Sequence, residues 1–187
     1  LGRFSNGLPW IKDGQLLFMS HMISKMKEGG SRIGMVTNGS PLTTGVGERG
    51  ESKFRKWLLD EDLLESIILL PDDLFFNTGI LSYIWIVNNN KDIKRKGKVQ
   101  LVNGLRKYKE LFKPIGDKRK RIDSKSRGEI LSDYMTFENN ESSLILNNDD
   151  FKYHYIKIYH PLLDDQGEII KDKKGNKKPD RNLTDSI

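Results

Sequence analysis

The sequence predicts an α/β fold, and two observations support this prediction. In residues 14–27, the apolar residues Leu16, Met19, Ile23 and Met26 recur at helical spacing; a glycine pair follows, and then the short apolar strand 32–37. Residues 64–70 (LESIILL) are almost continuously apolar, which is typical of a strand with both faces covered by helices. Helices and strands therefore alternate around a buried sheet.

The middle of the chain extends this pattern. Residues 38–51 are predicted to form a loop and residues 52–59 a helix before the strand 64–70. A loop of only about nine residues, 71–79, joins that strand to the next one, 80–87, and this is too short for a parallel crossover. A parallel sheet that ends in an antiparallel edge hairpin is typical of the C-terminal half of a class I (Rossmann-like) methyltransferase fold. The first strands of such a sheet are expected upstream of Leu1.

The C-terminal part has a different composition. Residues 98–102 are expected to form one more strand, and the basic residues 113–128 a linker or binding loop. A short helix at 129–137, a half-exposed strand at 151–159 and a charged hairpin or disordered tail after Pro161 are expected to follow. We therefore divide the chain into a half-domain at 1–112, the basic segment 113–128, and a mixed α+β appendage at 129–187, which is expected to be partly flexible.

Composition excludes several classes of protein. The chain has no cysteine, which excludes disulfide frameworks, thiolate metal sites and cysteine nucleophiles. No apolar run reaches the roughly 18–20 residues of a membrane span, and no secretory signal is visible, so a cytoplasmic protein without membrane contact is expected. The three histidines show no metal-ligand spacing with acidic residues, and no metal site is predicted.

Positive charge is concentrated in one stretch. Between Lys91 and Arg127 fifteen basic residues face four acidic ones, so this stretch carries +11 and the remainder of the chain −5, for a total of +6. Such an asymmetry is typical of a protein that binds a polyanion, with nucleic acid as the first candidate. The four consecutive cations Lys118, Arg119, Lys120 and Arg121 are the candidate DNA phosphate contacts. A solvated, lysine-rich surface and an exposed linker are the alternatives.

The loop after residue 70 contains two adjacent aromatic residues, Phe75 and Phe76. Both rings cannot easily turn inward from one loop, so at least one is expected to be exposed and to offer a stacking surface for a base. The residues that follow, Asn77, Thr78 and Gly79, are expected to form a supporting turn. The alternative is that both rings fill the core at the edge of the sheet.

A second motif resembles a dinucleotide-binding fingerprint. Residues 45–50 (GVGERG) match G-x-G-x-x-G, and Asp72 follows about 20 residues later. However, seven residues separate this motif from the preceding strand, whereas a phosphate site needs the first glycine directly after the strand. We therefore favour a loop, with a nucleotide-dependent oxidoreductase half-domain as an alternative.

The chain as a whole resembles a known family. The segments RFSNGLP, LLFMSHMISKMKEGGSRIGMV, LPDDLFFNTGI and SYIWIVNNNK are similar to the modification (M) subunit of type I restriction–modification systems, an N6-adenine DNA methyltransferase. KGKVQLVNG, GDKRK, EILSDYMTF, DDFKYHYIKIYHPL and KPDRNLTDSI extend the resemblance to the C-terminus. The family's F-x-G-x-G cofactor loop and its Asn-Pro-Pro-Phe catalytic tetrapeptide are not in this sequence, and both are expected upstream.

The resemblance implies a function for the complete subunit. S-adenosylmethionine would be its cofactor and the N6 of a flipped adenine in DNA its target. Specificity and restriction subunits, and a second M subunit, would be its partners. No catalytic residue is expected within this chain, and the chain alone is expected to be inactive. Phe76, with Phe75 as the second choice, matches the position of the aromatic that stacks on the flipped base. A non-catalytic nucleic-acid-binding module is the main alternative.

Overall fold

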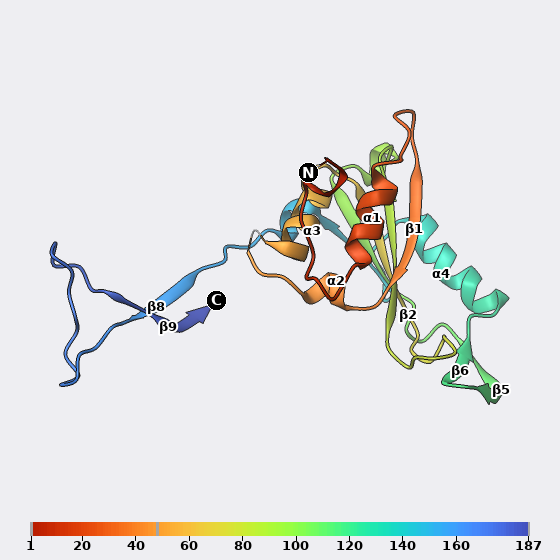
Figure 1. The fold of residues 1–187 in the computed structure, drawn as a ribbon. Coiled ribbons are helices and arrows are strands. Elements are labelled where there is room, and N and C mark those ends of the chain that lie inside the picture. The colour runs from red at the N-terminus through yellow and green to blue at the C-terminus, as the bar shows by residue number, and fades with distance from the viewer. Residues whose placement is uncertain (1, 48, 187) are drawn as a thin grey trace. The chain divides into compact units, whose positions relative to one another are not determined.

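The computed structural model of the chain describes residues 2–47 and 49–186 (Figure 1). Its helices are η1 (Gly2–Phe4), α1 (Gln15–Ile23), α2 (Ser40–Thr43), α3 (Gly50–Asp60), η2 (Ile93–Arg95), α4 (Ser124–Thr136) and η3 (Asn148–Phe151), where η denotes a 3-10 helix. Its strands are β1 (Arg32–Thr37), β2 (Leu64–Leu70), β3 (Ser82–Asn88), β4 (Lys98–Asn103), β5 (Lys109–Ile115), β6 (Lys118–Arg121), β7 (Ser143–Asn147), β8 (Lys157–Pro161) and β9 (Pro179–Ser186).

Five of the strands form a mixed central sheet with the order β1-β3-β2-β4-β7. Strand β3 is antiparallel to both β1 and β2, β2 is parallel to β4, and β7 is antiparallel to β4. The expected antiparallel pairing across the loop after residue 70 is confirmed. Its expected position at the edge is wrong, because β3 lies between β1 and β2, and β2 uses its second edge to pair with β4.

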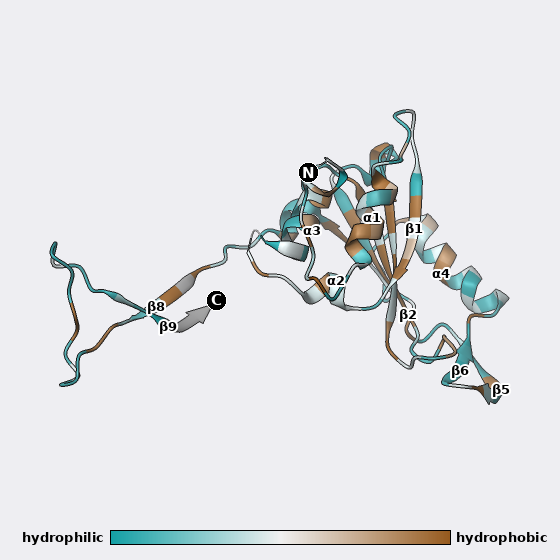
Figure 2. Ribbon diagram, in the orientation of Figure 1, coloured by the Kyte–Doolittle hydropathy of each residue, from teal (hydrophilic) through white to brown (hydrophobic). Residues whose placement is uncertain are grey.

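Helices cover both faces of this sheet, as the apolar run of β2 predicted (Figure 1). On one face, Leu16 of α1 and Phe54 of α3 pack into a core cluster with Trp85 of β3. On the other face, Ile130 of α4 packs into a second cluster with Val102 of β4. The apolar residues accordingly concentrate along the strands and the inner sides of the helices (Figure 2).

A buried polar network fixes α4 to the sheet. Glu65 of β2 is fully buried and accepts a hydrogen bond from the hydroxyl of Tyr134 on α4. Arg95 is also buried; it donates to Gln100 Oε1 at 3.0 Å and to the carbonyl of Tyr134. Gln100 Nε2 in turn donates to the carbonyl of Asp133 at 2.8 Å. Burial, followed by the bond to Glu65, raises the pKa of Tyr134 to about 12. The orientation of α4 therefore depends on polar groups as well as on apolar packing.

The basic segment is more ordered than the sequence suggested. Within 113–128 the chain completes the β5–β6 hairpin and begins α4, where a linker or loop was expected. The helix expected at 129–137 begins earlier because Asp123 caps it, accepting a hydrogen bond from the N–H of Ser126 at 2.8 Å. A favourable N-cap is enough to extend a helix into a polar stretch.

The chain divides into two compact units, and the boundary differs from the expected one. The first unit ends at Lys152 and the second begins at Tyr153. Residues 143–147, which were assigned to an appendage, instead form β7 and pair with β4 in the central sheet. This strand forms the edge of the sheet beyond β4, where no strand was expected from the sequence.

The second unit is built from β-hairpins. Strands β8 and β9 pair antiparallel, and the chain between them makes two tight turns, from Asp164 to Gly167 and from Asp172 to Gly175. In each turn the aspartate carboxylate accepts two backbone N–H groups and the glycine has a positive φ. The tail thus matches the hairpin alternative. The strand expected at 151–159 is wrong in its bounds, because β8 begins only at Lys157.

Within residues 2–47 and 49–186, no helix has the length and apolar character needed to cross a membrane.

Candidate nucleic-acid interface

The loop between β2 and β3 presents its two aromatic residues at the surface. Leu74 is buried in the second core cluster and anchors the start of the loop. Phe75 and Thr78 then pair in an isolated antiparallel bridge, which places Phe76 and Asn77 at the tip of a tight turn. Phe75 is 39% exposed and Phe76 is 53% exposed. The alternative in which both rings fill the core therefore does not fit, and Phe76 is the more accessible of the two.

The supporting turn is shaped by close contacts. Thr78 Oγ1 accepts a hydrogen bond from the N–H of Ile80 at 3.3 Å. A Cβ at Gly79 would lie 2.7 Å from Oδ1 of Asp73, so a larger residue would clash with that carboxylate. Asp73 itself has a φ of 52°, which L-residues rarely adopt. Asn77 is exposed at the tip.

The β5–β6 hairpin packs directly against this aromatic loop. The N–H of Asp117 donates to the carbonyl of Phe76 at 2.9 Å, and the N–H of Arg119 donates to the carbonyl of Asp73 at 2.9 Å. A Cβ at Gly116 would lie 2.5 Å from the Phe76 carbonyl oxygen, and Gly116 has a φ of 59°. Only glycine allows so close an approach. Two segments that are about 40 residues apart in the sequence thus form one surface.

The contact between these two segments was not expected from the sequence. A usable signal was present, since Gly116-Asp117 between the segments KELFKPI and KRKR is a two-residue hairpin turn with glycine in the first central position. The contact between the hairpin and the aromatic loop, by contrast, has no local signature in the sequence.

Alternation along β6 divides the four candidate phosphate contacts into two pairs. Lys118 and Lys120 are half-buried, whereas Arg119 and Arg121 are exposed. Successive side chains of a strand point to opposite faces, so the two lysines share one face and the two arginines the other. All four residues therefore lie on one hairpin, but the two lysines and the two arginines have different surroundings.

The two lysines already have partners within the loop. Lys118 Nζ lies 4.9 Å from the centroid of the Phe76 ring, a cation–π contact. Lys120 Nζ forms an ion pair with Asp72 and lies 4.5 Å from the centroid of the Tyr108 ring. The hydrogen bond to Asp72 raises the pKa of Lys120 above its usual value. The lysines thus brace the aromatic loop, while the arginines face solvent.

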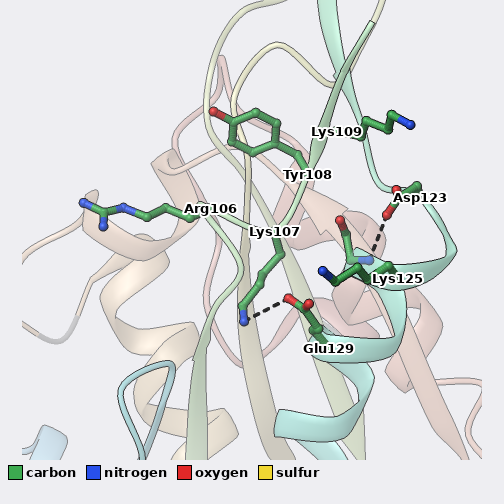
Figure 3. Close-up of a pocket in the computed structure, with 8 residues that line it drawn as sticks. Arg106, Lys107, Tyr108, Lys109, Asp123, Lys125 and Glu129 are labelled. Atoms are coloured by element: carbon green, nitrogen blue, oxygen red, sulfur yellow. Dashed lines mark hydrogen bonds and ion pairs between the residues drawn. The ribbon is translucent and has the colours of Figure 1, made fainter.

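A polar hollow of about 290 Å³ lies beside the base of the hairpin (Figure 3). The segment 106–109 and the first turn of α4 line it. Lys107 forms an ion pair with Glu129 at 3.1 Å. The hydrogen bond from the N–H of Ser126 lowers the pKa of Asp123, and the charges of Lys109 and Arg121 lower it further. The hollow was not expected from the sequence, because each of its cations, considered alone, is an ordinary surface lysine or arginine.

The glycine-rich segment near residue 45 does not fit a dinucleotide. A Cβ at Gly45 would lie 2.7 Å from the backbone nitrogen of Ser52, so the loop packs against the start of α3. Glu51, in the first turn of that helix, is buried and accepts a hydrogen bond from the N–H of Trp10 at 2.8 Å. A buried carboxylate at the helix N-terminus disfavours a pyrophosphate there. The geometry thus does not support the oxidoreductase alternative.

Comparison with curated proteins identifies relatives of this chain. The methylase subunit of the type I restriction enzyme HindI from Haemophilus influenzae is 34% identical over 101 residues, which are 54% of this chain and 22% of that protein. The methylase subunit of the type I restriction enzyme MjaVII from Methanocaldococcus jannaschii is 39% identical over 72 residues, 38% of this chain and 12% of that protein. The chain thus spans less than a quarter of the length of either relative.

Solved structures share its fold. The methyltransferase subunit of the type I restriction–modification system from Streptococcus thermophilus matches with a TM-score of 0.68 and 21% identity, over 80% of this chain and 30% of that one. A modification subunit from Vibrio vulnificus matches with a TM-score of 0.55 and 16% identity, over 83% of this chain and 30% of that one. The family model described as N-6 DNA Methylase matches residues 2–154. The chain therefore belongs to the N-6 DNA Methylase family.

Proposed function

We propose that this chain is the C-terminal half of the methyltransferase domain of a type I modification subunit. The complete subunit transfers a methyl group to the N6 of an adenine in DNA. The family match and the type I methylase subunits among its relatives support this proposal. Specificity and restriction subunits and a second modification subunit are its proposed partners. The cytoplasm, where the DNA lies, is its proposed location.

The free edge of β1 supports the idea that the sheet continues in another segment. Among the described residues, β1 pairs only with β3, so its other edge has unpaired backbone groups. Val36 on this strand is 50% exposed, on the same face as the exposed Arg32 and Gly34. A strand from the preceding part of the subunit would pair with this edge and cover it.

The exposed ring of Phe76 is the observation that carries the proposed role of this half. The N6 of adenine is inaccessible inside a stacked duplex, so the base must be rotated out before it can react. A flipped base needs a surface that replaces its lost stacking, and an aromatic ring contributes about 1–3 kcal/mol per base. Phe76 stands at a loop tip braced by Lys118, and Phe75 lies beside it. We assign base stacking to Phe76.

The cofactor and the groups that hold the amino nitrogen belong to another segment in this proposal. S-adenosylmethionine supplies an electrophilic methyl group to the complete subunit. The residues of this chain position the base and the duplex around that reaction. Asn77, Thr78 and Gly79 support the loop that carries Phe76, and no residue of this chain is assigned to the cofactor.

A methyl-transfer assay tests the proposal. The complete subunit and its specificity subunit are incubated with labelled S-adenosylmethionine and duplex DNA, and label in N6-methyladenine is measured by mass spectrometry of the digested DNA. Label in N6-methyladenine supports the proposal. DNA binding without any methyl transfer would instead favour a non-catalytic nucleic-acid-binding module.

The outward-facing pair on β6 gives a separate prediction for DNA binding. Replacing Arg119 and Arg121 with glutamine is expected to weaken binding equally for all DNA sequences, because phosphate contacts carry no sequence information. Each lost phosphate contact reduces the slope of log K against log salt by about 0.9, so the double variant should lose about 1–2 units of slope. Fluorescence anisotropy at several salt concentrations measures this slope. An unaltered slope would make the hairpin a linker without DNA contact.

A further inference from the structure

The polar hollow beside the β5–β6 hairpin contains more positive charge than its own acids neutralise. Its two acidic residues are already engaged: Asp123 accepts the N–H of Ser126 at 2.8 Å, and Glu129 pairs with Lys107 at 3.1 Å. The other lining cations are Arg106, Lys109 and Lys125, and none of them forms an ion pair within residues 2–47 and 49–186. The lining thus has four cations and two carboxylates, so a net charge of +2 remains for an external anion.

These cations come from three different segments. Arg106 lies in the connection after β4, Lys109 begins β5, and Lys125 lies in the first turn of α4. Figure 3 shows Arg106 and Lys109 extending outward on either side of the hollow, while Lys125 lies between them beside Glu129. Tyr108 and the buried Ser126 complete the lining. The side chains are long and exposed, so they can close around a small anion from several directions.

The hollow continues the surface proposed above for DNA. Lys109 lies directly opposite Arg121 in the β5–β6 ladder, whereas Lys118 and Phe76 lie at the other end of the hairpin, near its turn. Strand β6 from Lys118 to Arg121 spans about 10 Å at roughly 3.3 Å per residue. Along one strand of B-DNA this length corresponds to about three steps of about 3.4 Å. The length of β6 is thus comparable to the rise of about three nucleotides along the duplex axis.

The chemistry of the hollow fits a phosphate better than a base. Arginine and lysine form short, strong, charge-assisted hydrogen bonds to phosphate oxygens. At about 290 Å³, with a mainly polar lining in which Tyr108 is the one aromatic residue, the hollow offers little apolar surface for burying a base. The helix end itself is not the binding element, because Asp123 already occupies an N–H of its first turn. The side-chain cations are what an anion would meet.

We infer that this hollow, through Arg106, Lys109 and Lys125, binds a backbone phosphate of the DNA strand that carries the target adenine. The inference rests on the proposed function, since it takes the bound polyanion to be the methylation substrate. The contact fixes where the duplex lies along the hairpin relative to Phe76. It increases affinity without reading sequence.

The test is a pair of matched double variants in the complete subunit. Lys109→Gln with Lys125→Gln removes two cations of the hollow. Lys94→Gln with Lys96→Gln removes two exposed lysines from the same basic stretch, but beside η2, at the opposite end of β4. Duplex affinity is measured by anisotropy at several salt concentrations. The first pair is expected to reduce the slope of log K against log salt by about 1–2 units and the control pair to leave it unchanged.

Further variants and measurements distinguish a failure of this inference from a failure of the proposed function. Combining Lys109→Gln and Lys125→Gln with Arg119→Gln and Arg121→Gln should give the sum of the two slope changes if different phosphates are contacted. An unchanged slope in the hollow variant, an equal loss in the control, or no added loss in the combination would each overturn the inference. Stabilisation of the unaltered protein by inorganic phosphate, together with an unchanged DNA slope, would overturn it in favour of a free anion. The proposed function fails on a different measurement, the absence of methyl transfer by the unaltered subunit.

Discussion

Replacing Phe76 with alanine is expected to lower the rate of adenine methylation by about 10- to 100-fold, while duplex affinity changes by less than about threefold. A stacked base gains about 1–3 kcal/mol from an aromatic ring, and about 1.4 kcal/mol corresponds to a factor of ten in rate or equilibrium. Affinity for the duplex comes mainly from phosphate contacts, which this substitution leaves in place. Methyl transfer and anisotropy on the same DNA measure the two quantities.

Conservative variants make this prediction specific to stacking. Phe76→Tyr and Phe76→Trp keep an aromatic ring and should retain most of the rate. Phe75→Ala should have a smaller effect, because Phe75 is less exposed and is held in the bridge to Thr78. A fluorescent adenine analogue at the target position reports whether the base leaves the duplex and whether it stacks. A rate within about twofold of the unaltered enzyme for Phe76→Ala would remove the stacking role.

Much of the sheet was predictable because its elements have strong local patterns. The apolar run of β2 and the short loop that follows it predicted a strand buried on both faces and an antiparallel partner, and both are present. The insertion of β3 between β1 and β2 was not predictable in the same way. Strand order depends on which edges remain free after folding, and the apolar run of β3 indicates burial of both faces but not which two strands flank it.

The interface was harder to predict for a different reason. Strand β6 reads Lys-Arg-Lys-Arg, so its two faces carry the same charge and the usual alternation of apolar and polar residues is absent. Only the Gly116-Asp117 turn marked the hairpin. The lysines contact the aromatic loop and the arginines face solvent. This difference depends on contacts with Asp72 and Phe76, which lie far away in the sequence.

The burial of the polar residues beneath α4 could also not be predicted from the sequence. Arg95, Glu65 and Gln100 are all buried, although such residue types are normally placed at the surface. Each lies in or beside a strand and is satisfied by a partner on α4 or on a neighbouring strand. Since only two residues, 122 and 123, separate β6 from α4, the orientation of α4 also sets the position of the hairpin base and of the hollow.

Replacing Arg95 with alanine is therefore expected to destabilise the first compact unit by about 3–4 kcal/mol. The substitution removes hydrogen bonds to Gln100 and to the carbonyl of Tyr134, and hydrogen bonds to charged groups contribute about 1.5–3 kcal/mol each, less than additively. It also removes cation–π contacts with the rings of Tyr134 and Phe137, whose centroids lie 4.6 and 4.2 Å from the guanidinium carbon. Water that enters the vacated space recovers part of this loss.

The neighbouring residue Lys94 provides the control for this prediction. It lies in the same short helix η2 but is exposed, so Lys94→Ala should change the stability by no more than about 0.5 kcal/mol. Hydrogen exchange of the complete subunit, read by mass spectrometry, locates the effect. Amides of α4 should lose about 100- to 1000-fold of their protection in Arg95→Ala, because about 1.4 kcal/mol corresponds to a factor of ten. Arg95→Lys keeps the charge but cannot form the planar two-pronged contact, so an intermediate loss is expected. Undiminished protection of α4 in Arg95→Ala would show that the helix is held without Arg95, by apolar packing of Ile130 and the remaining hydrogen bonds of Tyr134 and Gln100.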